Sequence, residues 1–495
     1  MTTTPTASYS PRQITGLVLG PALFLITLLS GGPDQMPEAA AGVLAATLWI
    51  AVWWVTEAIP IEATSLLPIL LFPATGALPA GQTASAYAHP LVFLYLGGFV
   101  IALAIEKWNL HKRIALNVIY RVGTNLPMLI LGFMLATAFI SMWISNTATS
   151  LMMLPIAMAV ITHLQSPEEE SYHFARPLLL SIAYAASIGG MATLIGTPPN
   201  LVFAATVKQN FGHEITFSQW IIVGLPFSAI LLMLCWWMLT KVIFKLPSEP
   251  DNNSRDTIEE QLAEMGKMSV EEKLVLAIFL LTAFLWITRS FLFADQFPWL
   301  DDTLIAIWGA ILLFLLPAPG NRGERLMGWS DAVRLPWGIL LLFGGGLAIA
   351  AGFEKTGLAE WIGNSMTMLQ GVMFILIILA VTALVNFLTE ITSNLATASM
   401  ILPVLASLAL AMGVHPYALM VPAILAASCA FMLPVATPPN AVVFGPGILR
   451  IQDMVKAGFW LNIISILLIT FYLYWLLPVI WGIDLHRFPE AFRLK

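Results

Sequence analysis

Four polar interruptions lie within long apolar stretches of this sequence, and their residue types suit the binding of small ions. Two are Ser-Asn clusters, ISNTATSLMMLP around Asn146 and TSNLATASMILP around Asn394. The other two are Thr-Pro-Pro-Asn sequences that contain Pro198 and Pro438. Paired prolines remove two backbone donors and clash with the preceding turn, so each pair must interrupt a helix.

Such interruptions supply oxygen ligands for a cation. A broken helix frees backbone carbonyls, for example those of Gly196 and Ala436, and the clusters add Ser, Thr and Asn side-chain oxygens. The four interruptions contain no carboxylate, thiolate or imidazole. This composition favours a weakly held monovalent cation over a divalent or transition metal.

The Ser-Asn clusters are also suited to an anion. Each is expected to start a half-helix, whose free N–H groups and positive dipole end attract negative charge. Asn146, Thr147 and Asn394 add side-chain donors. No Lys or Arg occurs in either cluster or beside either proline pair, so a bound anion is expected to lack a fixed positive partner. A co-bound cation about 4 Å away would contribute about 4 kcal/mol at an effective dielectric of about 20. The pattern therefore predicts coupled transport of a cation and an anion.

The composition requires a membrane for these elements. Of the 495 residues 59% are hydrophobic and 10% charged, and the mean hydropathy is +0.85. Soluble domains carry about 25% charged residues, so a soluble enzyme, a nucleic-acid binder and a disordered chain are excluded. Cys235 and Cys429 lie in apolar runs, which gives no disulfide framework. No removable signal peptide is expected.

Apolar stretches long enough to cross about 30 Å of hydrocarbon predict eleven transmembrane helices. They are 14–31, 40–57, 60–79, 88–106, 177–207, 219–245, 271–292, 301–317, 335–354, 415–445 and 458–481. Two further stretches, 127–163 and 369–413, have polar centres and are predicted to be re-entrant hairpins. With the N-terminus in the cytoplasm and the C-terminus outside, sixteen of the 22 basic residues fall on the inner side, as the positive-inside rule requires.

The two halves of the chain form a repeat. At an offset of 248 residues Gly97 aligns with Gly345, Ser145 with Ser393 and Asn146 with Asn394, whereas Asn200 aligns with Asn440 at an offset of 240. Five predicted crossings separate the hairpins, and an odd number inverts the second copy relative to the first. Inverted repeats with broken helices are the architecture of secondary transporters, whose site lies at the repeat interface.

Several other polar residues lie in apolar surroundings and are candidates for functional or structural roles. Glu390, inside the second hairpin, is a candidate proton site, cation attractor or hairpin brace, because intramembrane carboxylates are functional by default. Glu57 and Glu62 flank a proline turn and are expected to be structural. His89 and His415 precede prolines at helix starts and are expected to be caps.

At these motifs the chain resembles the divalent-anion:sodium symporter (DASS, or INDY-type) family. The resemblance runs from WWVTEAIPIEATSLLP to FMLPVATPPNAVVFGPG. It implies a plasma-membrane homodimer with a static scaffold and an elevator-like transport domain. It further implies sodium-coupled symport of C4-dicarboxylates such as succinate, malate and fumarate, with no prosthetic group.

The resemblance also implies a division of the chain. Scaffold parts would comprise 1–126 (four spans and a surface helix) and 274–368, and transport parts 127–207 and 369–445. A span at 208–245, a cytoplasmic linker at 246–273 with a short surface helix from Thr257 onward, and a last span with the C-terminus at 446–495 would complete it.

Site residues are implied one by one. The first sodium site would take Ser141, Ser145, Asn146 and the Gly196 carbonyl, and the second Thr389, Ser393, Asn394 and the Ala436 carbonyl. Substrate carboxylates would meet Asn146, Thr147 and Asn394, with Pro198 and Pro438 lining the site. Leu395 departs from the Ser-Asn-Thr pattern and cannot donate a hydrogen bond, which leaves the choice of substrate open.

Other functions remain as alternatives. A sodium-independent dicarboxylate exchanger is disfavoured by the intact oxygen ligands of both clusters, and a sodium-coupled citrate or sulfate carrier stays open. An intramembrane hydrolase would need a base-paired nucleophile or a metal motif, and no HExxH, GxSxG or paired intramembrane Asp occurs. We therefore expect that the protein is not an enzyme. A channel would need a charged or carbonyl ring along its pore, and dead-end hairpins suit alternating access better.

Overall fold

A computed structural model describes residues 9–33, 36–123, 125–164, 171–247, 252–320, 323–365 and 373–492. Within these ranges the secondary structure is helical, and an isolated β-bridge joins Pro317 and Arg325. The first half contains α1 (Pro11–Leu29), α2 (Glu38–Thr56), α3 (Ile61–Thr64), α4 (Leu67–Ala74), α5 (Ala80–Ser85), η1 (Ala86–Ala88), α6 (Pro90–Lys107), α7 (Leu110–Val122), α8 (Leu126–Ser141), α9 (Asn146–Leu164), α10 (Ser171–Gly190), α11 (Pro198–Phe211), α12 (Phe217–Trp237) and η2 (Met238–Ile243).

The remainder of the described chain begins with the linker helix. It contains α13 (Asn252–Glu264), α14 (Val270–Thr288), η3 (Arg289–Phe293), α15 (Asp302–Leu315), α16 (Trp329–Ala332), α17 (Trp337–Lys355), α18 (Leu358–Ser365), α19 (Phe374–Thr389), α20 (Asn394–Met412), α21 (Tyr417–Ala427), α22 (Pro438–Phe444), α23 (Ile451–Trp481) and η5 (Glu490–Phe492). The linker helix predicted from Thr257 onward is present and starts earlier, at Asn252. Residues 248–251 of the linker lie outside the described part.

Eight helices of the described chain are long and apolar enough to cross a membrane. They are Pro11–Leu29, Glu38–Thr56, Ala80–Lys107, Phe217–Ile243, Val270–Phe293, Trp337–Lys355, Asn394–Met412 and Ile451–Trp481. All except Asn394–Met412, an arm of the second hairpin, coincide with predicted crossings. Three predicted crossings are each divided into two helices: 60–79 into α3 and α4, 177–207 into α10 and α11, and 415–445 into α21 and α22. The protein is a polytopic all-helical membrane protein.

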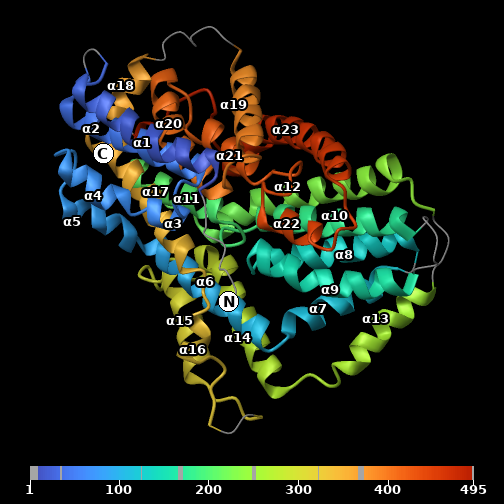
Figure 1. Cartoon of the computed structure of the whole chain (residues 1–495). Coiled ribbons are helices and arrows are strands. Elements are labelled where there is room, and N and C mark those ends of the chain that lie inside the picture. Colours follow the sequence, from blue (N-terminus) through green and yellow to red (C-terminus); the bar gives the residue numbers. More distant parts are fainter. Residues whose placement is uncertain are drawn as a thin grey trace, which may run out of the picture.

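The two halves interlock around the proline breaks. In Figure 1, α8, α9 and α10 lie together on one side of the molecule, and α1, α2, α4 and α5 lie on the opposite side. α11 packs against α20 and α21, whereas α22 packs against α9 and α10. Each half-helix that follows a break therefore contacts the hairpin of the other repeat. This exchange brings together residues that are hundreds of positions apart.

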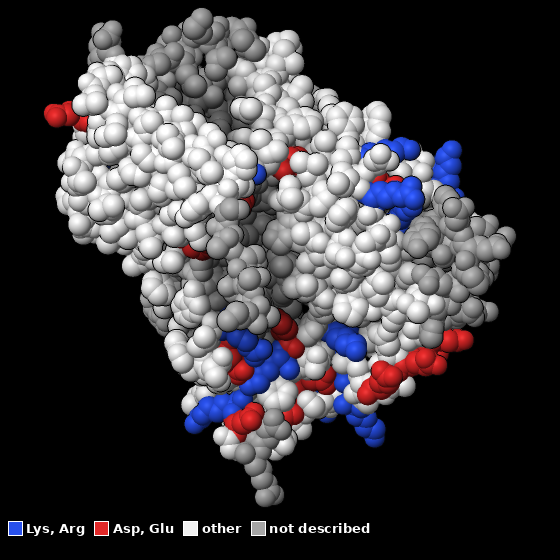
Figure 2. All heavy atoms as spheres, in the orientation of Figure 1, with Lys and Arg blue, Asp and Glu red and all other residues white. Residues whose placement is uncertain are grey.

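Charged residues are sparse over most of the helical body. On the face drawn in Figure 2 they gather along the lower and right-hand edges, and the remaining surface is almost free of charge. Exposed apolar side chains such as Leu29 (87% exposed) and Val479 (78%) cover that remainder. Burying apolar surface in lipid is the favourable arrangement for such a chain.

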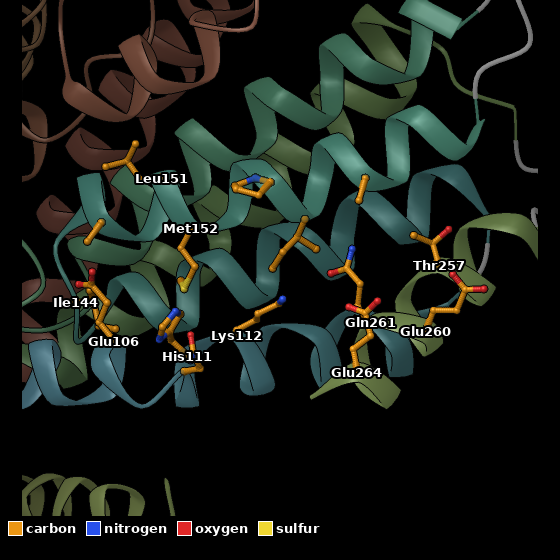
Figure 3. A pocket seen from close by; sticks show the side chains of 15 residues that line it. Glu106, His111, Lys112, Ile144, Leu151, Met152, Thr257, Glu260, Gln261 and Glu264 are labelled. Carbon is orange, nitrogen blue, oxygen red and sulfur yellow. The ribbon is translucent and has the colours of Figure 1, made fainter. Parts of the chain in front are cut away.

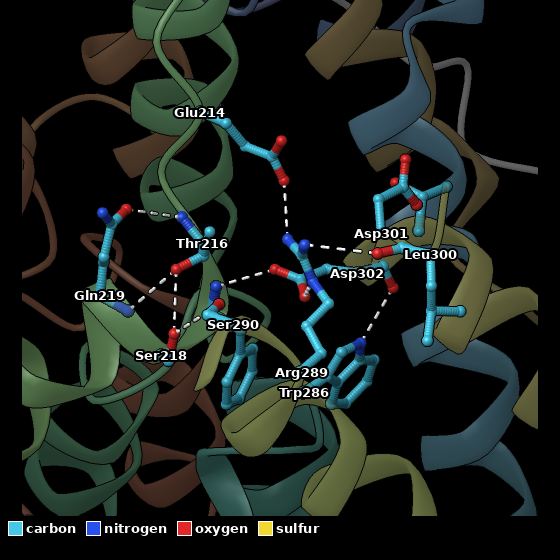
Figure 4. Close-up of polar contacts among 12 residues, drawn as sticks. Glu214, Thr216, Ser218, Gln219, Trp286, Arg289, Ser290, Leu300, Asp301 and Asp302 are labelled. Atoms are coloured by element: carbon cyan, nitrogen blue, oxygen red, sulfur yellow. Dashed lines mark hydrogen bonds and ion pairs between the residues drawn. The ribbon is translucent and has the colours of Figure 1, made fainter. Parts of the chain in front are cut away.

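An ion-pair network fastens the start of α12 to α14 and α15 (Figure 4). The Arg289 guanidinium donates to Asp302 Oδ1 at 2.6 Å and to Glu214 Oε1 at 2.8 Å. Asp302 Oδ2 accepts the N–H of Phe217 at 2.8 Å, and the Asp302 carbonyl accepts Trp286 Nε1 at 2.9 Å. The network satisfies the buried Asp302 carboxylate, as a charge at low dielectric requires.

The linker helix α13 packs across α7 and α9. A cavity of about 780 Å³ lies beside it and is lined by Glu106, Lys112, Glu260 and Glu264 among others (Figure 3). Arg113 anchors the linker, since it pairs with Glu272 at 3.1 Å and donates to the carbonyls of Met265 and Gly266. The linker is therefore docked onto the helices that precede and complete the first hairpin.

Close packing of α10 on α8 sets the position of the first hairpin tip. A Cβ atom at Gly189 would lie 2.3 Å from the carbonyl oxygen of Ala138, one turn before Ser141. Since backbone atoms cannot yield as a flexible side chain does, we expect Gly189→Ala to lower stability by about 1–3 kcal/mol. Thermal unfolding of the detergent-solubilised protein measures the loss. The control is Gly81→Ala, in α5, where a Cβ meets nothing within 4 Å. Equal melting of both variants would contradict the packing argument.

Candidate binding cavity

The hairpin tips and the proline breaks of both repeats line one cavity of about 530 Å³. The first repeat contributes Ser145, Asn146, Thr147, Gly196, Thr197, Pro198 and Pro199, and the second contributes Ile391, Thr392, Ser393, Asn394, Leu395, Val435, Ala436, Thr437, Pro438, Pro439 and Ala441. The structure thus brings together nearly all the predicted site residues. Ser141 and Thr389 do not line the cavity but are buried directly behind the tips.

At the first tip, hydrogen bonds fix the side chain of Asn146. Ser141 Oγ lies 2.7 Å from Asn146 Oδ1 and 2.7 Å from the carbonyl oxygen of Ala186. A Cβ atom built on Gly190 would lie 2.6 Å from Asn146 Oδ1 and 3.1 Å from the Gly196 carbonyl oxygen. Only glycine therefore allows the amide oxygen and the freed carbonyl to converge here, and together they form an oxygen-rich corner.

The second tip repeats this geometry. Thr389 Oγ1 lies 2.7 Å from Asn394 Oδ1 and 2.8 Å from the carbonyl oxygen of Ala427. The hydroxyl before the tip, the amide after it and a carbonyl of the neighbouring helix are the same three groups as in the first repeat. The two clusters, which share most of their residues in register, thus build equivalent tips.

The proline breaks start new helices instead of kinking continuous ones. α10 ends at Gly190 and α11 begins at Pro198, and α21 ends at Ala427 while α22 begins at Pro438. In the first helical turn the missing N–H of proline has no partner to lose. The predicted helix interruptions are confirmed.

The asparagines of both breaks hold the irregular backbone. Asn200 Nδ2 donates to the carbonyl of Thr193 at 2.7 Å, and Asn440 Nδ2 donates to those of Leu433 at 3.0 Å and Ala430 at 3.1 Å. The amide oxygens of both asparagines are buried without a hydrogen-bond partner among the described residues. Unpartnered oxygens beside each tip are consistent with a cation as partner.

Three helices of eight or more residues begin at the cavity. α9 starts at Asn146, α20 at Asn394 and α11 at Pro198. The positive end of each helix dipole therefore faces the same space, and α9 and α20 add the N–H groups of their first turns, which favours an anion.

Arg12 also lines the cavity, which the sequence did not predict. Its NH2 group donates to the carbonyl of Ile391 at 3.1 Å, at the second tip, and to the carbonyl of Val55 at the end of α2. The expectation that a bound anion would lack a fixed positive partner is therefore wrong. The one feature of the sequence that could have indicated a role for Arg12 is its isolation, since no other Lys or Arg occurs before Lys107.

Glu390 makes the contacts of a brace, one of the three roles left open. Its carboxylate accepts the backbone N–H groups of Phe431 at 2.8 Å, Met432 at 3.0 Å and Leu433 at 3.2 Å, and Asn462 Nδ2 at 2.7 Å. It thereby ties the second tip to the second break and to α23. Three successive N–H donors and an amide can satisfy a buried carboxylate without a cationic partner.

The first repeat braces its break differently. Met142 occupies the position equivalent to Glu390, and its carbonyl accepts Thr193 Oγ1 at 2.5 Å. The same hydroxyl accepts the N–H of Gly196 at 3.1 Å. The Thr193 hydroxyl thus braces the break of the first repeat, as the Glu390 carboxylate braces that of the second.

The remaining candidates have structural contacts. His89 Nδ1 accepts the N–H of Leu91 at 3.3 Å, and His415 Nδ1 accepts that of Tyr417 at 3.2 Å, so both predicted caps are confirmed. Glu57 ends α2 in a left-handed conformation with φ 50°. Glu57 and Glu62 both line the cavity, a position that the proline turn alone did not indicate.

An internal repeat whose hairpins and broken helices surround one polar cavity defines the class of secondary transporters. Over residues 12–481 the sequence matches the family described as the sodium:sulfate symporter transmembrane region. The chain belongs to this family, and the resemblance drawn from its motifs is confirmed.

Relatives and solved structures agree with this assignment. The chain is 47% identical over 492 residues to the sodium-dependent dicarboxylate transporter SdcS of Staphylococcus saprophyticus, covering 97% of this chain and 94% of that protein. The fold is similar to that of the YdaH transporter of Alcanivorax borkumensis, with TM-score 0.60, 14% identity and coverage of 89% and 99%. It is also similar to MtrF of Neisseria gonorrhoeae, from a class of antimetabolite efflux pumps, with TM-score 0.58, 13% identity and coverage of 92% and 98%.

Proposed function

We propose that the protein is a sodium-coupled symporter of C4-dicarboxylates such as succinate, malate and fumarate. The observation that carries this proposal is the single cavity in which two equivalent oxygen-rich tips meet the starts of three helices. The relative that is 47% identical and named a sodium-dependent dicarboxylate transporter supports it. Sodium is the coupling ion, and no prosthetic group takes part.

In this proposal each repeat binds one sodium ion. The first ion contacts Ser141, Ser145, Asn146 and the Gly196 carbonyl, and the second contacts Thr389, Ser393, Asn394 and the Ala436 carbonyl. The substrate carboxylates accept hydrogen bonds from Asn146, Thr147 and Asn394, while Pro198 and Pro438 form the adjacent walls. Asn146 and Asn394 face both ion and substrate, so an occupied sodium site orients the amide that the anion needs.

Coupling follows from charge. Two sodium ions offset the charge of a dianion, and at an effective dielectric of about 20 each close pair contributes about 4 kcal/mol. Substrate binding without sodium is then weak. Sodium without substrate leaves uncompensated positive charge in a cavity that is surrounded by lipid-embedded helices. The fully loaded carrier and the empty carrier should therefore change conformation most easily.

The movement is an elevator-like alternation. α8–α11 and α19–α22 form the transport part, and the remaining spans form the scaffold of a homodimer in a plasma membrane. Eleven crossings and two re-entrant hairpins place the N-terminus in the cytoplasm and the C-terminus outside. With the N-terminus in the cytoplasm, the end of the cavity at Arg12 would be its cytoplasmic end.

Uptake of labelled succinate into proteoliposomes tests the function. We expect uptake with an inward sodium gradient and none with an equal potassium gradient. Unlabelled malate, citrate and sulfate as competitors identify the substrate class. Uptake that ignores sodium but requires internal dicarboxylate would instead make the protein an exchanger.

A further inference from the structure

We propose that Arg12 binds one carboxylate of the transported dicarboxylate at the second hairpin tip and thereby contributes to selection for a dianion. The inference rests on the proposed function and assigns a binding role to a residue outside both hairpins and both breaks. Arg12 lies on α1, whose first turn reaches the cavity through its contacts with α2.

The guanidinium is held at the tip by only one of its nitrogens. Arg12 NH2 donates to the carbonyls of Ile391 and Val55. The Nε–H and the two N–H groups of NH1 have no hydrogen-bond partner among the described residues, and Arg12 forms no ion pair there. Since arginine carries five N–H donors in a planar fork, three remain for a ligand. The remaining donors of this charged fork can make charge-assisted hydrogen bonds to carboxylate oxygens.

The charge has no counterpart elsewhere on the cavity wall. Among the described lining residues Arg12 is the only Lys or Arg, and the tips contribute neutral side chains. Glu57 and Glu62 lie on the same wall without an ion pair to Arg12. Arg12 is therefore the only positive side chain on the described wall that can attract an anion, and it does so against the negative charge of the two glutamates.

Arg12 lies beside the tip that lacks the threonine donor. In the first repeat Thr147 follows Asn146, whereas in the second repeat Leu395 follows Asn394 and has no hydroxyl. Leu395 is 4% exposed and lines the cavity. The guanidinium reaches Ile391, four residues from Leu395, on the same tip. We infer that Arg12 replaces the missing threonine donor with a stronger, charged one.

Binding of succinate to the purified protein at saturating sodium tests this role. Arg12→Gln is expected to weaken succinate affinity about tenfold or more, the usual effect of losing a charge-assisted hydrogen bond. Arg12→Lys keeps the charge but loses the fork, so its affinity should lie between those of wild type and Arg12→Gln. Gln13→Ala is the matched control, because Gln13 Nε2 ties the same helix end to the Glu57 carbonyl at 3.2 Å without carrying charge. It should bind succinate as wild type does.

A second ligand separates recognition from support of the fold. Succinamate, the monoamide of succinate, lacks one carboxylate, so wild type should prefer succinate strongly and Arg12→Gln should lose most of that preference. The inference is overturned if Arg12→Gln keeps the wild-type affinity for succinate and the wild-type preference over succinamate. A change in transport rate or melting temperature alone would then mean that Arg12 only supports the structure. If wild type itself binds no dicarboxylate with sodium, the proposed function fails, and this inference fails with it.

Discussion

Replacement of Asn394 by alanine is expected to reduce sodium-dependent succinate uptake to background while the protein remains folded. The Asn394 amide lines the cavity, and its oxygen accepts a hydrogen bond from Thr389 at 2.7 Å. In the proposed mechanism this one side chain contacts a sodium ion and a substrate carboxylate, so both are weakened together. Losing a ligand or its orienting partner typically costs about 10–100-fold in ion affinity, and loss of the substrate contact adds to that. Asn146→Ala should behave in the same way, since Ser141 holds Asn146 with the same geometry.

Proteoliposome uptake and size-exclusion chromatography together measure this effect. The control is Asn117→Ala in α7, whose amide donates to the carbonyl of Arg113 away from the cavity, and which should transport as wild type does. Wild-type uptake by either Asn146→Ala or Asn394→Ala would remove the sodium and substrate sites from the tips. An aggregated variant would be replaced by Asn→Ser, which keeps one oxygen and should retain partial uptake.

Replacement of Glu390 by alanine is expected to cause the largest loss of stability among single substitutions at the site. It would leave the buried N–H groups of Phe431, Met432 and Leu433 without their acceptor. Each unsatisfied group costs about 1–3 kcal/mol, so the second break should lose its fixed shape and uptake should vanish. Glu390→Gln keeps one acceptor oxygen and should be intermediate in both respects.

Thermal unfolding in detergent, with and without sodium, measures the Glu390 effect. The control Glu260→Gln alters an exposed carboxylate on α13 and should melt as wild type does. Glu390→Met installs the residue found at the equivalent position of the first repeat, where a Thr193 hydroxyl does the bracing. If Glu390→Met melted and transported like wild type, the carboxylate would not be a brace.

The sequence predicted those parts of the site that the repeat encodes twice. The Ser-Asn tips, the Pro-Pro breaks and their residues recur at fixed offsets, and residue types alone indicate oxygen ligands and helix starts. The inverted repeat then implied that all four meet, and the single cavity lined by Asn146 and Asn394 agrees with this. Helix caps such as His89 were predictable for the same reason, because their partners are a few residues away.

Contacts between distant segments were not predictable from local pattern. Arg12 reaches Ile391 across 379 positions, and periodicity gives no information on which distant elements meet. The partners of Glu390 are mostly backbone N–H groups, which every residue but proline carries, so no residue type announces them. The crossing predicted at 60–79 is mostly apolar, yet it divides into α3 and α4 because hydropathy measures burial in lipid and not helix continuity.

The unequal bracing of the two breaks has an energetic consequence. In an inverted repeat, inward-facing and outward-facing forms arise when the two halves exchange conformations, and identical halves would populate both forms equally. Here a Thr193 hydroxyl supports one break and the Glu390 carboxyl group supports the other, so the inward-facing and outward-facing forms differ in free energy. A difference of only about 1.4 kcal/mol gives a tenfold preference for one form. We therefore expect the empty carrier to populate mainly one of the two forms, inward-facing or outward-facing. The rates of substrate release and rebinding should then differ between the two directions of transport.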